Sequence, residues 1–210
     1  MQDNTFAAKE NKGFTKYTNQ LVVEYAENDY TTMHQFFEHP EDYGIDINNV
    51  DVSLGEFYTD NTEEIKEDQK ELNKFNRNTL DKTQQTIYDE LKYENELSIK
   101  AENKKFQYLN NCWSTMSGLH QSLISVFSEY ILRSEKDIQD LITLINDVPR
   151  YTNDVLEYTK KQADKNTLQF DYDSVIQDIQ DVINNKENSS ITSALYLSLI
   201  HISEPTRHAQ

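Results

Sequence analysis

The chain has 210 residues, with 20 Lys and Arg against 37 Asp and Glu, so its formal net charge is −17. Four glycines and three prolines exclude a collagen-like or low-complexity chain. A single cysteine excludes a disulfide framework and a thiolate zinc site. The negative charge repels phosphate backbones, so no nucleic-acid partner is expected. No segment approaches the roughly 20 apolar residues of a membrane span, and none is expected.

The first part of the chain predicts one amphipathic helix. Residues 1–11 are polar, without an apolar period, and are expected to be frayed. In residues 13–27 the apolar side chains recur at helical spacing. They are Phe14, Tyr17, Leu21, Val22 and Tyr25.

A shorter helix is predicted after Asp29, whose side chain can cap its first turn. Its expected inward side chains are Met33, Phe36 and Phe37. Pro40 ends this helix, because the residue before a proline avoids the helical conformation. Residues 43–55 are loop-like, with one short extended segment expected at 50–54.

Residues 59–108 are highly charged and carry two short apolar stripes at helical spacing. The stripes are Ile65, Leu72 and Phe75, and then Ile87, Leu91 and Leu97. A coiled coil needs an apolar seam over three or four heptads, and this seam fades after about two. The pattern therefore predicts a helical hairpin that bends near residues 76–79.

The second half predicts further helices. One has an apolar face that consists of Leu119, Leu123, Val126, Phe127 and Tyr130. Ser134 and Asp137 have the spacing of a capping box that opens the next helix. Pro149 is expected to end that helix or to lie in the first turn of another. Asp173 and Ser174 are expected to cap a last helix, whose inward side chains are Val175, Ile176, Ile179, Val182 and Ile183.

The end of the chain differs from the rest. Residues 197–207 resemble, residue for residue, a translated transposase-type sequencing-library adapter, and the last three residues match the length of the index that follows it. We interpret 197–210 as an adapter-derived tail and exclude it from the fold. The alternative is a native amphipathic tail. The predicted class is all-α, with a bundle-like helical domain over residues 12–196 that is incomplete.

His34, Glu38 and His39 are the first candidates for a metal site. The zinc motif HExxH places its two histidines four residues apart on one helix face, with the glutamate beside the metal-bound water. Here the histidines are five residues apart and fall on different faces. We therefore interpret them as helix-end histidines that pack or form hydrogen bonds.

Other candidate sites also have simpler interpretations. Two alternating oxygen pairs begin like calcium loops, and these are Asp46 with Asn48 and Asp171 with Asp173. Neither has a glycine at the required sixth position, so both are interpreted as solvated turns. Cys112 and His120 lie eight residues apart, and the thiol beside the sole tryptophan is interpreted as a packing residue. No catalytic, cofactor-binding or metal-ligating residue is assigned in this chain.

Three stretches, taken in order, resemble a bacterial family known as domain of unknown function 885. They are residues 14–55, which include His39-Pro-Glu-Asp-Tyr-Gly-Ile45; residues 117–149, which include Arg133-Ser-Glu-Lys-Asp137; and the helix at 173–183. The resemblance implies an all-helical zincin-type hydrolase, a zinc peptidase. The family's metal motif, H-E-G-x-P-G-H, lies C-terminal to the stretches matched here and does not occur in this sequence.

The resemblance therefore implies an N-terminal, non-catalytic fragment that forms helical walls of a substrate cleft. Zinc and a peptide substrate would bind to the full-length parent, and lipoprotein-like relatives imply the cell surface. Such a fragment is expected to expose the apolar faces at 119–130 and 175–183, and either to self-associate or to form a molten helical state. The alternative is a complete acidic helical interaction or cell-surface binding module without catalytic activity.

Overall fold

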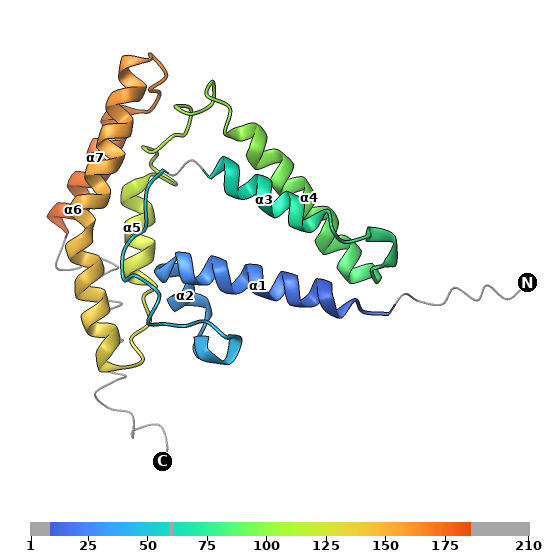
Figure 1. Ribbon diagram of the computed structural model, residues 1–210. Coiled ribbons are helices and arrows are strands. Elements are labelled where there is room, and N and C mark those ends of the chain that lie inside the picture. Colours follow the sequence, from blue (N-terminus) through green and yellow to red (C-terminus); the bar gives the residue numbers. More distant parts are fainter. Residues whose placement is uncertain (1–8, 59–60, 186–210) are drawn as a thin grey trace, which may run out of the picture. The chain divides into compact units, whose positions relative to one another are not determined.

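The structure is a computed structural model that describes residues 9–58 and 61–185 (Figure 1). The interpreted tail, 197–210, lies outside the described residues, as does most of the segment expected to be frayed. The described residues form seven α-helices and two short 3-10 helices and contain no strand, which confirms the all-α class. The extended segment expected at 50–54 pairs with no strand there.

The helices follow one another with mostly short connections. Their bounds are α1 Lys12–Asn28, α2 Tyr30–Phe36, η1 Pro40–Tyr43, α3 Thr62–Leu72, η2 Arg77–Thr79, α4 Lys82–Ala101, α5 Leu119–Ser128, α6 Glu135–Asp164 and α7 Tyr172–Asn184. None of the helices in the described ranges is both long and apolar enough to cross a membrane.

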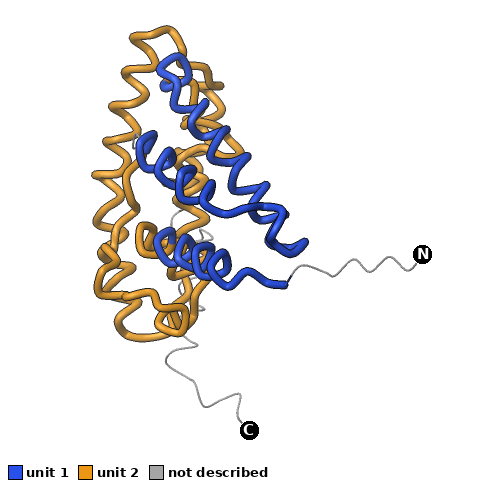
Figure 2. Tube along the Cα trace, turned by 45° about the vertical axis from the view of Figure 1, so that its right-hand side comes forward, with its two compact units in different colours: residues 1–25, 58–107 blue, residues 26–57, 108–210 orange. Residues whose placement is uncertain are grey.

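The chain divides into two compact units (Figure 2). Unit 1 consists of residues 1–25 and 58–107, and unit 2 consists of residues 26–57 and 108–210. The sequence pattern did not indicate this division.

Unit 1 contains the predicted helical hairpin. Helices α3 and α4 lie side by side and are joined through η2, at the predicted bend (Figure 1). Asn76 caps η2, and Asp81 with Gln84 forms a capping box that starts α4. The buried core of this unit brings helices α1, α3 and α4 together through Phe14, Leu72, Leu80 and Tyr88.

Gln84 also ties the start of α1 to α4. Its Nε2 donates hydrogen bonds to the backbone oxygen of Asn11, at 2.9 Å, and to Oγ1 of Thr15, at 3.0 Å. Its Oε1 accepts a hydrogen bond from the Asn11 backbone N–H, at 2.9 Å. The buried amide of Gln84, on α4, therefore forms three hydrogen bonds with the start of α1.

The core of unit 2 forms where residues 108–119 lie against α6. Its buried members are Cys112, Leu119, Val155 and Tyr158, and Trp113 packs against them. The Trp113 Nε1 donates to Oγ1 of Thr159 at 2.8 Å. The chain's single tryptophan therefore lies in the core of unit 2, and its fluorescence reports the unfolding of this unit.

Two predicted helix starts in unit 2 are confirmed. Asp29 caps α2 by accepting from the Thr32 N–H at 3.1 Å, and Ser134 with Asp137 forms a capping box at α6. The cap of α7 was predicted two residues too late. Asp171 accepts from the Ser174 N–H at 3.2 Å, so the helix begins at Tyr172.

Some predicted core positions are not buried. Phe36, expected to face inward, is 72% exposed, and the buried face of α2 consists of Tyr30, Met33 and His34 instead. Conversely, the faces expected to be exposed are mostly covered, since Leu119, Phe127 and Val175 are buried within unit 2. Ile183, in the second of these faces, is exposed as expected.

The prediction that Pro149 ends a helix is wrong. It lies inside α6, a continuous helix of 30 residues. Buried side chains lie on both sides of it, Leu144 before and Val155 after, and their packing favours one helix over two. Arg150 adds an ion pair across the proline, to Asp147 at 2.6 Å, and a second one to Asp154 further along the helix, at 2.9 Å.

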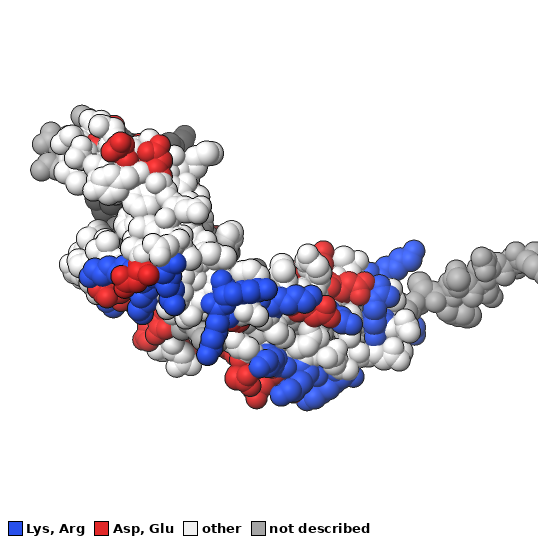
Figure 3. All heavy atoms as spheres, turned by 90° about the horizontal axis from the view of Figure 1, so that it is seen from above, with Lys and Arg blue, Asp and Glu red and all other residues white. Residues whose placement is uncertain are grey.

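Charges of both signs are interspersed on the surface. Figure 3 shows Lys and Arg beside Asp and Glu on the face that it presents. Exposed pairs of this kind include Lys66 with Glu63 and Lys160 with Glu157, both at 2.6 Å. Such pairs contribute about 0–1 kcal/mol each, so the two cores carry more of the stability.

The substitution Pro149→Ala is expected to stabilise unit 2 by about 1–3 kcal/mol, because alanine restores an N–H that can bond the Ile145 carbonyl. The measurement is urea unfolding followed by Trp113 fluorescence. Pro40→Ala is the matched control, since Pro40 opens η1 where proline fits, and it should lower stability by less than about 1 kcal/mol. Equal shifts in the two variants would contradict the prediction.

Candidate functional site

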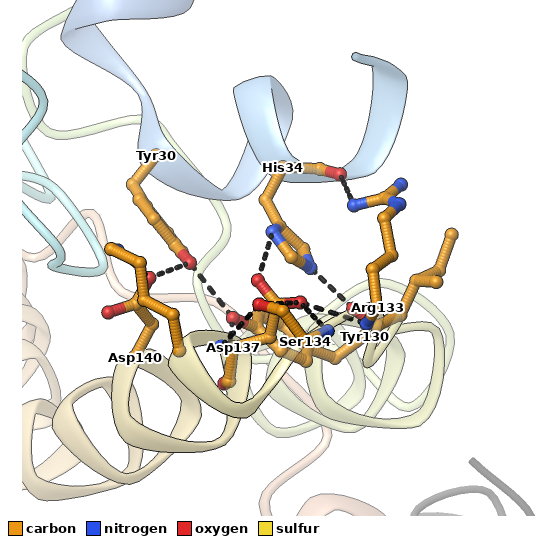
Figure 4. Close-up of polar contacts among 9 residues, drawn as sticks. Tyr30, His34, Tyr130, Arg133, Ser134, Asp137 and Asp140 are labelled. Atoms are coloured by element: carbon orange, nitrogen blue, oxygen red, sulfur yellow. Dashed lines mark hydrogen bonds and ion pairs between the residues drawn. The ribbon is translucent and has the colours of Figure 1, made fainter. Parts of the chain in front are cut away.

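The most densely bonded polar group of unit 2 lies where α2 meets the start of α6 (Figure 4). We call it the His34 cluster, and it consists of Tyr30, His34, Tyr130, Arg133, Asp137 and Asp140. Tyr30 and His34 are four residues apart, so they project from the same face of α2. Asp137 and Asp140 come from the first turns of α6.

His34 is held by stacking on its ring faces and by a hydrogen bond from a ring nitrogen. The side chain is buried, with 7% of the residue exposed. Its ring stacks on Tyr130 with centroids 4.2 Å apart and on Tyr30 at 5.7 Å. Its Nε2 lies 2.7 Å from the backbone oxygen of Ile131, so this nitrogen carries the proton and donates. The imidazole therefore anchors α2 to residues 130–131.

The electrostatic surroundings keep His34 neutral. Burial lowers the pKa of His34 below its usual value. The hydrogen bond to Ile131 and the Asp137 carboxylate, whose Oδ1 lies 3.8 Å from Nδ1, act in the opposite direction but are smaller. Arg133 also disfavours a second positive charge. A neutral imidazole that donates through Nε2 is a structural group here.

Asp137 binds the start of α6 through one carboxylate oxygen. Its Oδ2 accepts hydrogen bonds from the Arg133 N–H at 2.8 Å, from the Ser134 N–H at 2.7 Å and from the Ser134 hydroxyl at 3.0 Å. Arg133 in turn donates from Nη1 to the backbone oxygen of His34 at 2.9 Å. The carboxylate thus organises both the helix start and the segment that contacts α2.

Two tyrosines complete the cluster. The Tyr30 hydroxyl donates to Oδ2 of Asp140 at 2.8 Å and lies 2.9 Å from the Tyr130 hydroxyl. Burial raises the pKa of Tyr30 and that of Tyr130 well above their usual range. The hydrogen bond between them raises the pKa of Tyr30 further and lowers that of Tyr130, but its effect on Tyr130 is smaller than that of burial. Both phenols therefore stay protonated at neutral pH. Asp140 also pairs with Lys136, so its charge is compensated.

A small pocket opens beside the cluster. It is lined by Thr31, His34, Gln35, Ser125, Val126, Glu129 and Tyr130. Gln35 donates from Nε2 to Oε2 of Glu129 at 3.1 Å on this side of the molecule. The cluster residues that reach the pocket, His34 and Tyr130, are the ones already stacked on each other.

The structure gives His34, Glu38 and His39 separate surroundings. Because α2 ends at Phe36, Glu38 and His39 lie beyond the helix and are exposed. His39 approaches Glu41, with Nδ1 3.7 Å from Oε1, whereas His34 faces the buried cluster. Within the described ranges, no three or more His, Cys, Asp or Glu are arranged to hold a metal ion.

The two calcium-like pairs occupy local turns. Asp46 Oδ1 accepts from the Asn48 N–H at 3.0 Å and from its Nδ2 at 2.9 Å, which is a turn closed by a side chain. Asp171 accepts from Ser174 as the cap of α7, and Asp173 lies in the first turn of that helix. The described hydrogen bonds of Asp46 and Asp171 therefore stay within their own turns.

Cys112 and His120 have different partners. Cys112 is buried in the core of unit 2, and burial raises the pKa of its thiol to about 11. Its thiol is therefore protonated at neutral pH and weakly nucleophilic. His120 lies beside Asp178 instead, with Nε2 3.8 Å from Oδ2.

The roles of Tyr30, Tyr130 and Asp140 were not predicted from the sequence. The spacing of Tyr30 and His34 did carry a signal, since residues four apart share a helix face. Their partners lie about 100 residues further along the chain, and no local pattern identifies such a contact.

Removal of the Tyr30 hydroxyl tests the cluster. Tyr30→Phe is expected to lower the free energy of unfolding by about 1–3 kcal/mol, because buried Asp140 loses a hydrogen-bond donor. Urea unfolding followed by Trp113 fluorescence measures it. Tyr43→Phe removes a hydroxyl from an exposed ring and should change stability little. If both variants lose the same amount, the Tyr30 bond contributes nothing specific.

A second test uses pH. The unfolded chain protonates His34 near pH 6.5, whereas the pKa of His34 is lower in the folded protein. The folded state then binds fewer protons, so stability is kept above about pH 6.5 and falls as the pH decreases below it. His34→Gln should be less stable throughout but lose less stability between pH 7.5 and 5.5. The control is His39→Gln at the exposed histidine, which should change stability little at pH 7.5.

The comparison with known families agrees with the family resemblance of the sequence. A family model described as "Bacterial protein of unknown function (DUF885)" matches residues 48–206. The match covers more than half of the chain and includes helices α3 to α7. It also includes residues 197–206 of the interpreted tail and leaves residues 14–47 outside. Searches of curated proteins and of solved structures give no match.

Proposed function

The chain belongs to the bacterial family of unknown function DUF885, and we propose that it is the N-terminal, non-catalytic part of a zinc-dependent peptidase of that family. Its helices form walls of a substrate cleft in the parent protein. The zinc ligands and the general base belong to sequence that lies C-terminal to the matched stretches. Zinc and a peptide substrate are thus partners of the parent, and the cell surface is its proposed location.

The observation that supports this proposal is that the polar side chains described in unit 2 are occupied by structural contacts. A catalytic base needs a free lone pair directed at substrate, but His34 Nε2 is bonded to Ile131 and its ring is stacked on Tyr130. Asp137 Oδ2 already accepts three hydrogen bonds from Arg133 and Ser134. Cys112 is a buried, protonated thiol. These groups build a scaffold and leave the reaction to another part of the protein.

We expect the purified chain to bind less than one zinc ion per molecule. The sample is first washed with a chelator and then dialysed against a zinc solution. We also expect no cleavage of casein or of a fluorogenic peptide library. Metal analysis by mass spectrometry and a fluorescence assay provide the readouts. Stoichiometric zinc together with cleavage that a chelator abolishes would overturn the assignment of a non-catalytic part.

The source DNA separates this proposal from a complete interaction module. Amplification across codon 196 should show a reading frame that continues into a region with an H-E-G-x-P-G-H motif. The longer product should bind one zinc, and replacement of the first histidine of that motif with alanine should remove it. A stop codon at or near codon 196 would contradict the peptidase proposal and favour the complete acidic interaction or cell-surface binding module.

A further inference from the structure

Helix α2 passes into η1 at a corner of unit 2 that exposes aromatic rings to solvent. We call it the aromatic corner, and it consists of Phe36, Phe37, Glu38, Glu41, Asp42 and Tyr43. Phe36 and Tyr43 are 72% and 62% exposed. The Phe37 ring meets the Tyr43 ring nearly edge-on, with centroids 5.1 Å apart, and this contact closes residues 37–43 into a compact turn after α2 (Figure 1). Exposed rings of this size gain free energy when a partner covers them.

Backbone hydrogen bonds hold this turn in one conformation. The Gly44 N–H donates to the Glu41 carbonyl at 3.1 Å, and the Ile45 N–H donates to the Pro40 carbonyl at 3.2 Å. Ile45 itself is buried and anchors the end of the turn. The exposed Tyr43 ring is therefore carried by a defined backbone, so little further ordering is needed when a partner binds.

The carboxylates of the aromatic corner have no cationic partner of their own. Glu38, Glu41 and Asp42 are exposed, and within the described ranges no Lys or Arg forms an ion pair with any of them. The basic side chain that approaches them is that of His39, whose Nδ1 lies 3.7 Å from Oε1 of Glu41. The corner therefore combines exposed rings with negative charge that the fold leaves uncompensated.

The distribution of Lys and Arg explains why this charge stays uncompensated. The chain contains no Lys or Arg between Lys16 and Lys66. In the described part of unit 2, Lys and Arg occur only between residues 133 and 165. Lys136, Arg150 and Lys160 there pair with carboxylates of α6 itself. Positive charge for the aromatic corner is therefore expected from a partner.

The two properties of the corner together select the chemistry of that partner. A purely apolar surface would cover the rings but would take water from the carboxylates without replacing its hydrogen bonds. An acidic surface would be repelled. The guanidinium of arginine satisfies both requirements, because its plane stacks on an aromatic ring while its N–H groups bind a carboxylate in pairs. The ammonium of lysine is a point charge that cannot do both in the same way.

We propose that the aromatic corner is a docking surface for an arginine-bearing segment of another protein. Guanidinium groups of that segment stack on the exposed rings of Phe36 and Tyr43 and donate hydrogen bonds to the carboxylates of Glu41 and Asp42. The inference is independent of the proposed function, since it requires neither zinc nor a C-terminal part. Exposed contacts of this kind are individually weak, so the segment carries more than one arginine.

The first test keeps the charge of the chain constant. Binding of fluorescein-labelled hexa-arginine to the full chain is measured by fluorescence anisotropy at about 0.15 M salt, which screens the distant charges. Phe36→Ser is expected to raise the dissociation constant about threefold or more, because it removes a stacking surface. The matched control is Tyr93→Ser on α4, an equally exposed ring that lies beside Lys92, and it should leave the constant unchanged. Circular dichroism and Trp113 fluorescence check that each variant remains folded.

A wild-type chain that does not bind hexa-arginine would overturn the proposal, and so would equal effects of the two substitutions. A dimer that sedimentation velocity detects without peptide and that Phe36→Ser abolishes would also overturn it, in favour of a second copy of this chain as the occupant.

The second test separates the carboxylates of the corner from the net charge of the chain. Glu41→Gln combined with Asp42→Asn should weaken hexa-arginine binding several-fold. Glu94→Gln combined with Glu96→Gln on α4 removes the same charge from exposed positions elsewhere and should have a much smaller effect. Hexa-lysine should bind the wild type several-fold more weakly than hexa-arginine. Equal weakening by the two double substitutions, or equal binding of the two peptides, would contradict a site for arginine.

Discussion

The Asp137 carboxylate is the group on which the contact between α2 and the start of α6 depends. By accepting from Arg133 and Ser134 it fixes where α6 begins and how residues 130–133 approach that helix. Arg133 and His34 then hold α2 against the same segment. A single charge at a helix start, where the macrodipole favours it, thus determines the placement of two other elements.

The chemistry that surrounds this carboxylate is that of a scaffold. Stacked rings and buried hydroxyls occupy the space around His34, and burial favours neutral groups. A reacting site requires a group poised to gain or lose a proton near neutral pH. In the His34 cluster, the phenols hold their protons and the imidazole stays neutral. The polar residues of the His34 cluster therefore resemble a core more than a cleft.

Local signals predicted the elements well, and contacts distant in sequence escaped them. The caps at Asp29 and Ser134 and the hairpin bend near Asn76 depend on neighbouring residues, so spacing was sufficient to find them. Pro149 misled the prediction, because packing on both sides outweighs its missing N–H. The cluster of Tyr30 with Asp140 joins residues 110 positions apart, which no periodicity encodes.

Gln84 shows how one side chain can restrict which sequences are acceptable. Glutamate has nearly the same shape and caps helices equally well, and yet a carboxylate cannot donate to the Asn11 carbonyl or to the Thr15 hydroxyl oxygen. The start of α4 alone would accept either residue, whereas its contact with α1 accepts the amide. A conservative exchange at this position would therefore be neutral for the helix and harmful to unit 1, so we expect divergent relatives that keep this contact to retain glutamine there.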